Sequence, residues 1–120
     1  MEKIKYSNII PFKGYSAINL FGLIIGRKEY GTLSKSTINH EIIHSAQALD
    51  FCKGFIGFVI FYMLYFLEWV FKLLPSLFTG NNAYRSISFE QEAYEHEREY
   101  TYLPNRKRFD WIKYVFKLKK

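Results

Sequence analysis

Two of the three histidines in this chain lie four residues apart, in the segment "STINHEIIHSAQALDF", residues 36–51. On a helix each residue advances by about 100°, so His40 and His44 return to one face and their imidazoles can bind one metal ion. Glu41 directly follows the first histidine. In HExxH sites zinc lowers the pKa of a bound water to about 7, and the glutamate accepts its proton as the water attacks a carbonyl. The motif therefore predicts two zinc ligands and a general base.

An ordinary amphipathic helix could carry the same letters by chance, because short motifs recur across many proteins. The flanking sequence does predict a helix, over residues 35–51, as the chemistry requires. Three residues could cap its start: Ser34, Ser36 and Thr37. Apolar residues recur at spacings that would bury its back face: Ile38, Ile42 and Leu49.

A zinc site that keeps one position open needs a third protein ligand. Asp50 lies six residues after His44, the offset at which some longer HExxH motifs place their last ligand. Those motifs break the helix with a glycine, whereas Gln47 stands in this chain. An unbroken helix would turn Asp50 to the wrong face.

Two glutamates on a second predicted helix are the other candidates. Ser88 stands three residues before Gln91, a capping-box spacing that predicts a helix over residues 89–102. Its buried side is marked by Phe89, Ala93 and Tyr100. Glu90 and Glu92 flank that side by about 80° on either hand, so helix geometry leaves both open. The negative charge of a glutamate in a first helical turn also interacts favourably with the helix dipole, which explains both residues without a metal.

The composition describes one domain, residues 1–120, with enough apolar residues for a core. Hydrophobic residues make up 49% and aromatic residues 20%, which suggests that part of the surface is not meant for water. Cys52 is the single cysteine, so an internal disulfide and a thiolate zinc site are excluded. A metal must therefore use histidine and carboxylate ligands.

The distribution of charge bears on partners and location. The chain has 17 Lys and Arg against 11 Asp and Glu, and basic residues gather at both ends. This favours an anionic membrane surface over nucleic acid. The start, "MEKIKYSNIIPFKGYS", lacks the apolar core and cleavage site of a secretory signal peptide. We expect a membrane-associated protein with its site on the cytoplasmic side, or alternatively a soluble cytoplasmic one.

The remaining segments complete a mostly helical α+β fold. "AINLFGLII", residues 17–25 between Gly14 and "GRKEYG", predicts a buried strand of a short N-terminal strand pair. Pro104 and "NRKR" predict a loop. "RFDWIKYVFKLKK", residues 108–120, predicts an amphipathic basic helix. Its apolar side would hold Phe109, Ile112, Val115 and Phe116.

Residues 55–78, "FIGFVIFYMLYFLEWVFKLLPSLF", are the most apolar part of the chain. The first thirteen carry no charge or proline, but as a helix they extend about 20 Å, against a hydrocarbon core of about 30 Å. Continuing to Phe78 adds length at the cost of including Glu68, Lys72 and Pro75. Membrane contact and burial as a core helix both stay open.

Two longer stretches carry a family resemblance. "TINHEIIHSAQ" and "AYRSISFEQEAYEHEREYTYLPNRKRFDWIKY" resemble a family of small zincin-like proteins with patterns INHExIHxxQ and YRxxxFExEAY. The resemblance covers most of the chain from about residue 11 onward. It is also similar to the gluzincin class of metallopeptidases, in which the first glutamate of an ExxA(D) pattern binds the metal.

The resemblance implies zinc bound by three residues: His40, His44 and Glu90. Ala93 would match the alanine of the pattern, while Tyr94 stands where those enzymes usually keep an aspartate. That departure keeps Glu92 as an alternative third ligand. Four further residues could stabilise charge on a substrate carbonyl or orient a ligand, although each also suits a structural role: Tyr84, Arg85, Tyr94 and His96.

A zinc site would constrain the topology of the apolar segment. If residues 55–78 crossed a bilayer once, His40 and Glu90 would lie about 30 Å apart and could share no ion. The segment must then be broken or re-entrant, lie in the interface, or be buried in protein. The apolar surface of residues 55–67 favours the in-plane or re-entrant form.

The sequence thus predicts a zinc-dependent metallopeptidase that acts on a peptide or protein, with the 17–25 strand as an edge for an extended substrate. One alternative is a non-catalytic, zinc-binding, membrane-associated protein. Another is a structural membrane protein whose "HEIIH" binds no metal.

Overall fold

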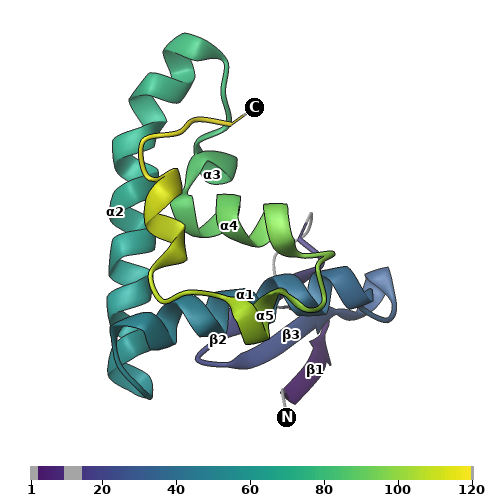
Figure 1. Ribbon diagram of the computed structural model, residues 1–120. Coiled ribbons are helices and arrows are strands. Elements are labelled where there is room, and N and C mark those ends of the chain that lie inside the picture. Colours follow the sequence, from purple (N-terminus) through teal and green to yellow (C-terminus); the bar gives the residue numbers. More distant parts are fainter. Residues whose placement is uncertain (1–2, 10–14, 120) are drawn as a thin grey trace.

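The computed structural model describes residues 3–9 and 15–119. Its elements in chain order are β1 (Lys3–Ser7), β2 (Ala17–Leu20), β3 (Leu23–Arg27), the 3-10 helix η1 (Lys28–Tyr30), α1 (Lys35–Phe51), α2 (Phe55–Thr79), α3 (Ala83–Ser86), α4 (Ser88–His96), α5 (Tyr102–Asn105) and the 3-10 helix η2 (Asp110–Tyr114). The predicted mostly helical α+β class is confirmed. Figure 1 shows α2 as a long rod along one edge, with the other elements on one side of it.

The sheet has three strands in the order β1-β3-β2, with β1 parallel and β2 antiparallel to β3. The single strand predicted over residues 17–25 is wrong, because the run folds as a hairpin. Phe21 and Gly22 both have positive φ, +52° and +92°, as a tight two-residue turn requires. β1 was not predicted, and Gly14 lies outside the described residues. β2 is left at the edge of the sheet.

Helix α1 begins where the sequence predicts, because the Ser34 Oγ accepts a hydrogen bond from the Thr37 N–H at 3.2 Å. Its predicted back face is wrong. Leu49 is 51% exposed, and Ile38 and Ile42 are only half-buried. The polar side of α1 that carries the HEIIH motif faces the interior instead, so His40, Glu41 and His44 are buried.

Helix α2 runs unbroken through Pro75, so the broken or re-entrant form predicted for this segment is not observed. Phe58 and Phe61 pack in the core with Ala48 of α1 and Phe89 of α4. The two helices approach so closely at Gly57 that an added Cβ would lie 2.0 Å from the Cys52 carbonyl oxygen. Glycine is therefore required at this crossing.

Helix α4 is shorter than the predicted 89–102. It ends at His96, where Asn39 Nδ2 donates to the Glu97 carbonyl oxygen at 2.8 Å and satisfies a helix-terminal acceptor. Tyr100, predicted to be buried, is 50% exposed as a result.

The predicted capping box at Ser88 is also wrong. The Ser88 N–H and hydroxyl both donate to the Glu68 carboxylate of α2, at 2.7 and 2.6 Å. Gln91 Nε2 turns away from the helix start and donates to the carbonyls of Ser86 and Lys117, at 2.7 and 2.8 Å. Contacts between elements have replaced the local cap.

The C-terminal amphipathic helix predicted over residues 108–120 is reduced to the 3-10 helix η2. The carbonyl oxygens of Tyr114 and Lys117 accept hydrogen bonds from Gln91 Nε2 instead of continuing a helix. Lys119 forms a β-bridge with Asn82. Phe116, placed on the buried side by the sequence, is 99% exposed. The loop predicted around Pro104 contains the short helix α5, and Lys120 lies outside the described residues.

Candidate metal centre and cleft

The structure brings together three side chains from two helices. Within the described residues, one group of His, Cys, Asp and Glu could hold a metal ion: His40, His44 and Glu90, all buried, with candidate ligand atoms within 4.8 Å of one another. Glu90 Oε1 lies 2.9 Å from His40 Nε2 and 3.3 Å from His44 Nε2. Tetrahedral zinc ligands at about 2.0–2.1 Å lie about 3.3 Å apart, so this spacing fits the ion.

The outer nitrogen of each imidazole is held by an acceptor. His40 Nδ1 donates to Glu97 Oε1 at 2.8 Å, and His44 Nδ1 donates to Gln47 Oε1 at 2.8 Å. A carboxylate and an amide oxygen can only accept, so both Nδ1 atoms carry the proton. Both Nε2 atoms then point at Glu90 with the tautomer that suits metal binding.

Tyr65 of α2 completes the setting of Glu90, because its hydroxyl donates to Oε2 while Oε1 faces the histidines. Three elements thus meet at one carboxylate. The sequence motifs did not point to this tyrosine. The available signal was a pair of tyrosines, Tyr62 and Tyr65, one turn apart in the uncharged stretch of residues 55–67.

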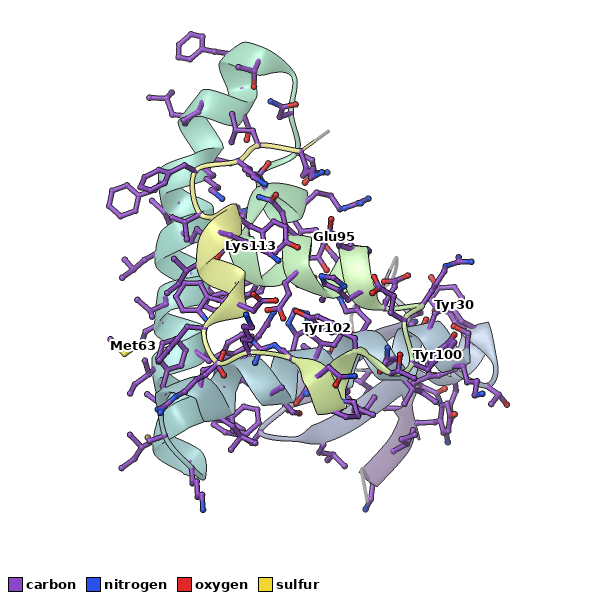
Figure 2. All side chains as sticks on the ribbon, in the orientation of Figure 1. Tyr30, Met63, Glu95, Tyr100, Tyr102 and Lys113 are labelled. Carbon is purple, nitrogen blue, oxygen red and sulfur yellow. The ribbon has the colours of Figure 1, made fainter. Side chains whose placement is uncertain are left out.

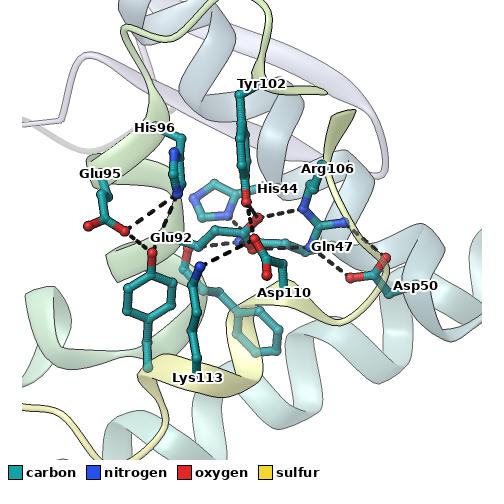
Figure 3. Close-up of polar contacts among 12 residues, drawn as sticks. His44, Gln47, Asp50, Glu92, Glu95, His96, Tyr102, Arg106, Asp110 and Lys113 are labelled. Carbon is teal, nitrogen blue, oxygen red and sulfur yellow. Dashed lines mark hydrogen bonds and ion pairs between the residues drawn. The ribbon is translucent and has the colours of Figure 1, made fainter. Parts of the chain in front are cut away.

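The other two candidate ligands are bound elsewhere. Asp50 accepts two hydrogen bonds from the Arg106 guanidinium, at 3.0 and 2.7 Å, and Glu92 forms an ion pair with the same group. Gln47 Nε2 donates to Glu92 Oε1 at 2.9 Å, which continues the chain of contacts to His44. Figure 3 shows this chain from His44 to Asp50. Neither acid joins the three-residue cluster.

The charges inside the cluster perturb one another. Burial lowers the pKa of His44, but the negative charge of Glu90 and its hydrogen bond outweigh burial and raise this pKa to about 9. Burial raises the pKa of Glu90, but His44 and His40 hold it well below its usual range. A positive charge therefore belongs between these groups, carried by a proton or by a metal ion.

Glu41 lies beside the cluster at the wall of a cleft. Burial raises the pKa of its carboxyl, with His44 and His40 opposing the shift. Its backbone carbonyl accepts a hydrogen bond from Asn19 Nδ2 at 2.7 Å, and the same amide donates to Ser45 Oγ at 2.7 Å. Asn19 therefore ties the edge strand β2 to the helix that carries the motif, a role that the sequence analysis missed.

The cleft consists of two neighbouring cavities that meet at Glu41. The larger, of about 750 Å³, lies between β2 and α2, and its lining includes His44 and Glu90. The smaller, of about 200 Å³, lies at the starts of β2 and α1 and is bordered by His40 and Glu97. The three-residue cluster therefore borders both cavities, with His44 and Glu90 at the larger and His40 at the smaller.

Of the four residues considered as electrophiles, Tyr84 and Tyr94 border the cleft. Tyr84 lines both cavities, and burial followed by the charge of Glu90 raises its pKa, which keeps the hydroxyl protonated. Tyr94 packs edge-on against the His40 ring, with centroids 4.5 Å apart. Arg85 lies over the Tyr94 ring and is not among the cleft-lining residues.

His96 lies outside the cluster. Its ring stacks on Tyr102 with centroids 3.7 Å apart, and its Nδ1 binds Glu99 Oε2 at 2.8 Å. Figure 3 places it beside Glu95, on the far side of Glu92 from Asp50. These contacts describe a residue that stabilises the end of α4.

No family model, curated relative or solved structure matches the chain. The resemblance to zincin-like proteins therefore stays a prediction drawn from its motifs. The evidence on function is the site itself: two imidazoles, one carboxylate and a neighbouring glutamate in a cleft.

Proposed function

We propose that the protein is a zinc-dependent hydrolase of peptide bonds. The observation that carries the proposal is the convergence of His40, His44 and Glu90 beside Glu41 in an open cleft. Nitrogen and carboxylate ligands in this number suit a catalytic zinc site, which keeps one position free. Bound zinc supplies a water whose pKa is lowered to about 7.

The chain's own residues have separable roles in this proposal. His40, His44 and Glu90 hold the ion, and Glu97 and Gln47 fix the two imidazole rings. Glu41 accepts a proton from water as that water attacks the carbonyl carbon, and later donates it to the leaving amine. Tyr84, a protonated hydroxyl at the cleft wall, would donate a hydrogen bond to the substrate carbonyl oxygen in place of its bond to Tyr94.

Strand β2 supports a peptide as the substrate. It lies at the sheet edge and lines the cleft from Ala17 to Leu20. Leu20 and Leu23 flank the two-residue turn and pair through hydrogen bonds, so Ala17 and Asn19 direct their backbone groups away from β3. The Asn19 carbonyl already accepts a hydrogen bond from the Tyr62 hydroxyl, so an extended peptide would pair with this edge at Ala17, which lines the cleft together with Glu41.

The test is a comparison of the natural chain with Glu41→Gln. The amide cannot accept the proton, so we expect zinc content and fold to be retained and hydrolysis of a casein-derived peptide mixture to be lost. His44→Ala should lose both zinc and hydrolysis. Equal hydrolysis by the natural chain and Glu41→Gln would rule out Glu41 as the base.

We also propose that the protein acts at a membrane surface, with α2 in the plane of the interface. Among the described residues, α2 is the one helix long and apolar enough to cross a membrane, and 22% of its most apolar window is buried. Its exposed apolar side chains include Phe55, Ile56, Met63, Phe66, Leu67, Val70, Phe71, Leu74, Leu77 and Phe78. Met63 points away from the body of the molecule in Figure 2.

The two charges of α2 do not reach this face. Lys72 Nζ binds Glu68 Oε2 at 2.7 Å, and both side chains are turned into the protein, 8% and 14% exposed. The outer face is therefore uncharged along a helix of 25 residues, about 37 Å long. Lying in the interface would cover it while α1 and α4, which pack on the inner side, stay in water.

An anionic lipid surface suits this face better than a second copy of the chain. The net charge is +6, so two copies would repel each other. Lys53 at the start of α2 and Lys117 and Lys119 near the C-terminus are exposed, and each contributes about 1 kcal/mol near an anionic surface. The alternative function, a non-catalytic zinc-binding membrane protein, predicts zinc and membrane binding without Glu41-dependent hydrolysis.

A further inference from the structure

The two cavities of the cleft differ in chemistry as well as in size. The larger is walled by apolar side chains of both bordering elements, among them Ile18 and Leu20 of β2 and Phe61, Phe66 and Trp69 of α2. The smaller is bordered by polar groups, including Thr37, Glu97 and the His40 ring. Four residues belong to both walls, Tyr15, Ala17, Glu41 and Tyr84, so the boundary between the cavities runs past the proposed base.

A chain that follows β2 must pass through both cavities. Tyr15 and Ala17 border both cavities, Ser16 borders the smaller one, and Ile18 to Phe21 border the larger one, so the strand leads from the smaller cavity into the larger. Side chains of an extended peptide on opposite sides of the bond at Glu41 would therefore enter different cavities.

We propose that this cleft selects peptides with a bulky apolar side chain on one side of the cleaved bond and a small side chain on the other. The selection rests on the proposed hydrolysis, because it is defined relative to the bond at Glu41. A volume of about 750 Å³ walled by Phe61, Phe66 and Trp69 accepts aromatic or branched aliphatic groups. The smaller cavity, of about 200 Å³, is bordered by the Glu41 and Glu97 carboxylates, so burying a large apolar side chain there would desolvate polar groups without giving them new partners.

The apolar wall is continuous with the outer face of α2. Phe66 lines the larger cavity and is also 60% exposed. At the end of β2, Phe21 stacks on Phe55 with ring centroids 5.0 Å apart and an interplanar angle of 10°. Apolar peptide segments held at a lipid surface would meet this rim first.

The experiment measures binding of short, blocked, fluorescent peptides to zinc-loaded Glu41→Gln, so that cleavage does not interfere. The three probes have Phe–Ala, Ser–Ala or Phe–Trp as their two central residues. Each is also made with these two residues in the reverse order, because an extended chain can run along β2 in either direction. Burying one large apolar side chain is worth at least about tenfold in affinity, so Phe–Ala should bind at least tenfold more tightly than Ser–Ala. Phe–Trp should bind more weakly than Phe–Ala, because one bulky group would face the smaller cavity.

Phe66→Ala and Phe71→Ala in the same background form a matched pair. Both phenylalanines are exposed on α2, 60% and 76%, but only Phe66 is among the cleft-lining residues. Phe66→Ala should weaken Phe–Ala binding several-fold and leave Ser–Ala binding unchanged, whereas Phe71→Ala should change neither.

Equal affinities for Phe–Ala and Ser–Ala, or equal effects of the two alanine variants, would overturn the proposed selectivity. Tight Phe–Trp binding would also overturn it, because the smaller cavity would then accept a bulky group. Selective binding without any Glu41-dependent hydrolysis would support the assignment of the cavities and refute only the proposed reaction.

Discussion

Glu90 is the residue at which three helices meet. It lies on α4, its Oε1 faces two histidines of α1, and its Oε2 accepts a hydrogen bond from Tyr65 of α2. One oxygen is thus directed at the proposed metal and the other is occupied. The carboxylate is held in one orientation by groups from separate parts of the chain, which favours a rigid ligand.

The first prediction concerns this tyrosine. Tyr65→Phe removes the hydroxyl that orients Glu90 and should lower zinc affinity about 10–100-fold, the usual cost of losing a group that orients a ligand. Tyr62→Phe is the control, because the Tyr62 hydroxyl binds Phe21 N–H and the Asn19 carbonyl instead. Competition with a zinc-binding dye measures both. Similar affinities in the two variants would show that the bond to Glu90 does not matter for zinc.

A second prediction separates the two glutamates that helix geometry left open. Glu90→Gln should lose most of the bound zinc, since two histidines alone bind it weakly. Glu92→Gln should keep zinc but lose about 1.5–3 kcal/mol of folding stability, because Arg106 keeps Asp50 and loses its second charged partner in a buried position. Metal analysis and urea unfolding of both variants give the two readouts. Zinc loss confined to Glu92→Gln would reverse the assignment.

The sequence could predict the motif, its helix and the cap at Ser34, because these depend on neighbours in the chain. It could not choose between Glu90 and Glu92 from geometry alone. The choice depends on Arg106, which lies after a loop and pairs with Glu92 and Asp50. The role of Glu97 as the partner of His40 could have been predicted from the sequence, because Glu97 lies seven residues after Glu90 and so returns to the same helical face.

At the scale of elements, contacts between helices override local patterns. α4 ends where Asn39 donates hydrogen bonds to the carbonyls of His96 and Glu97. η2 ends at Tyr114, whose carbonyl accepts a hydrogen bond from Gln91. Those partners lie on other elements, so periodicity predicted longer helices in both places. The hairpin of β2 and β3 was missed because Phe21 adopts a left-handed conformation that this residue type rarely takes.

The crossing of α1 and α2 gives a prediction at this scale. Gly57→Ala places a methyl group against the carbonyl oxygens of Cys52 and Ala48, at 2.0 and 2.7 Å before any shift. The helices must separate, which should cost about 1–3 kcal/mol or more in urea unfolding. Ile56→Ala is the control, because Ile56 is 64% exposed and should change stability by no more than about 0.5 kcal/mol. Equal stability of the two variants would contradict the tight crossing.

At the scale of the whole molecule, α2 has an exposed apolar face on its outer side and lines the cleft on its inner side. Figure 1 shows α2 at the margin, so its outer side can meet a surface while its inner side borders the cleft. Glu68 and Lys72 would not enter lipid in this orientation, because they bind each other and Lys72 also binds the Ser86 carbonyl on the inner side of α2. The structure therefore permits a membrane-facing helix and a water-facing site in one small domain.

Vesicle binding tests this arrangement. The natural chain should sediment with vesicles that contain anionic lipid and less with neutral ones. Leu67→Glu, on the outer face of α2, should reduce sedimentation several-fold because it buries a charge in the interface. Leu49→Glu on α1 is the matched control, since the two leucines are similarly exposed, 46% and 51%. Equal sedimentation of the two variants would refute docking through α2.

Labels give the topology. Single cysteines at Ser36 and at Asn82, in a Cys52→Ser background, should both react with a membrane-impermeant reagent from outside the vesicle. Protection of one site alone would establish a crossing. Concentration-dependent dimers in solution that Leu67→Glu dissociates would assign the face to a second copy of the chain.

The hydrogen bond from Tyr65 to Glu90 connects α2, the helix proposed to face lipid, to the carboxylate proposed to bind the metal. By thermodynamic reciprocity, if docking changes zinc affinity by some factor, zinc must change lipid affinity by the same factor. A coupling of 1.4 kcal/mol would be tenfold in each direction, about the worth of this one charge-assisted bond. Zinc titrations with and without vesicles, repeated for Tyr65→Phe, would measure it. A zinc affinity that rises on vesicles in the natural chain but not in Tyr65→Phe would show that the proposed lipid surface favours the proposed metal site through this bond.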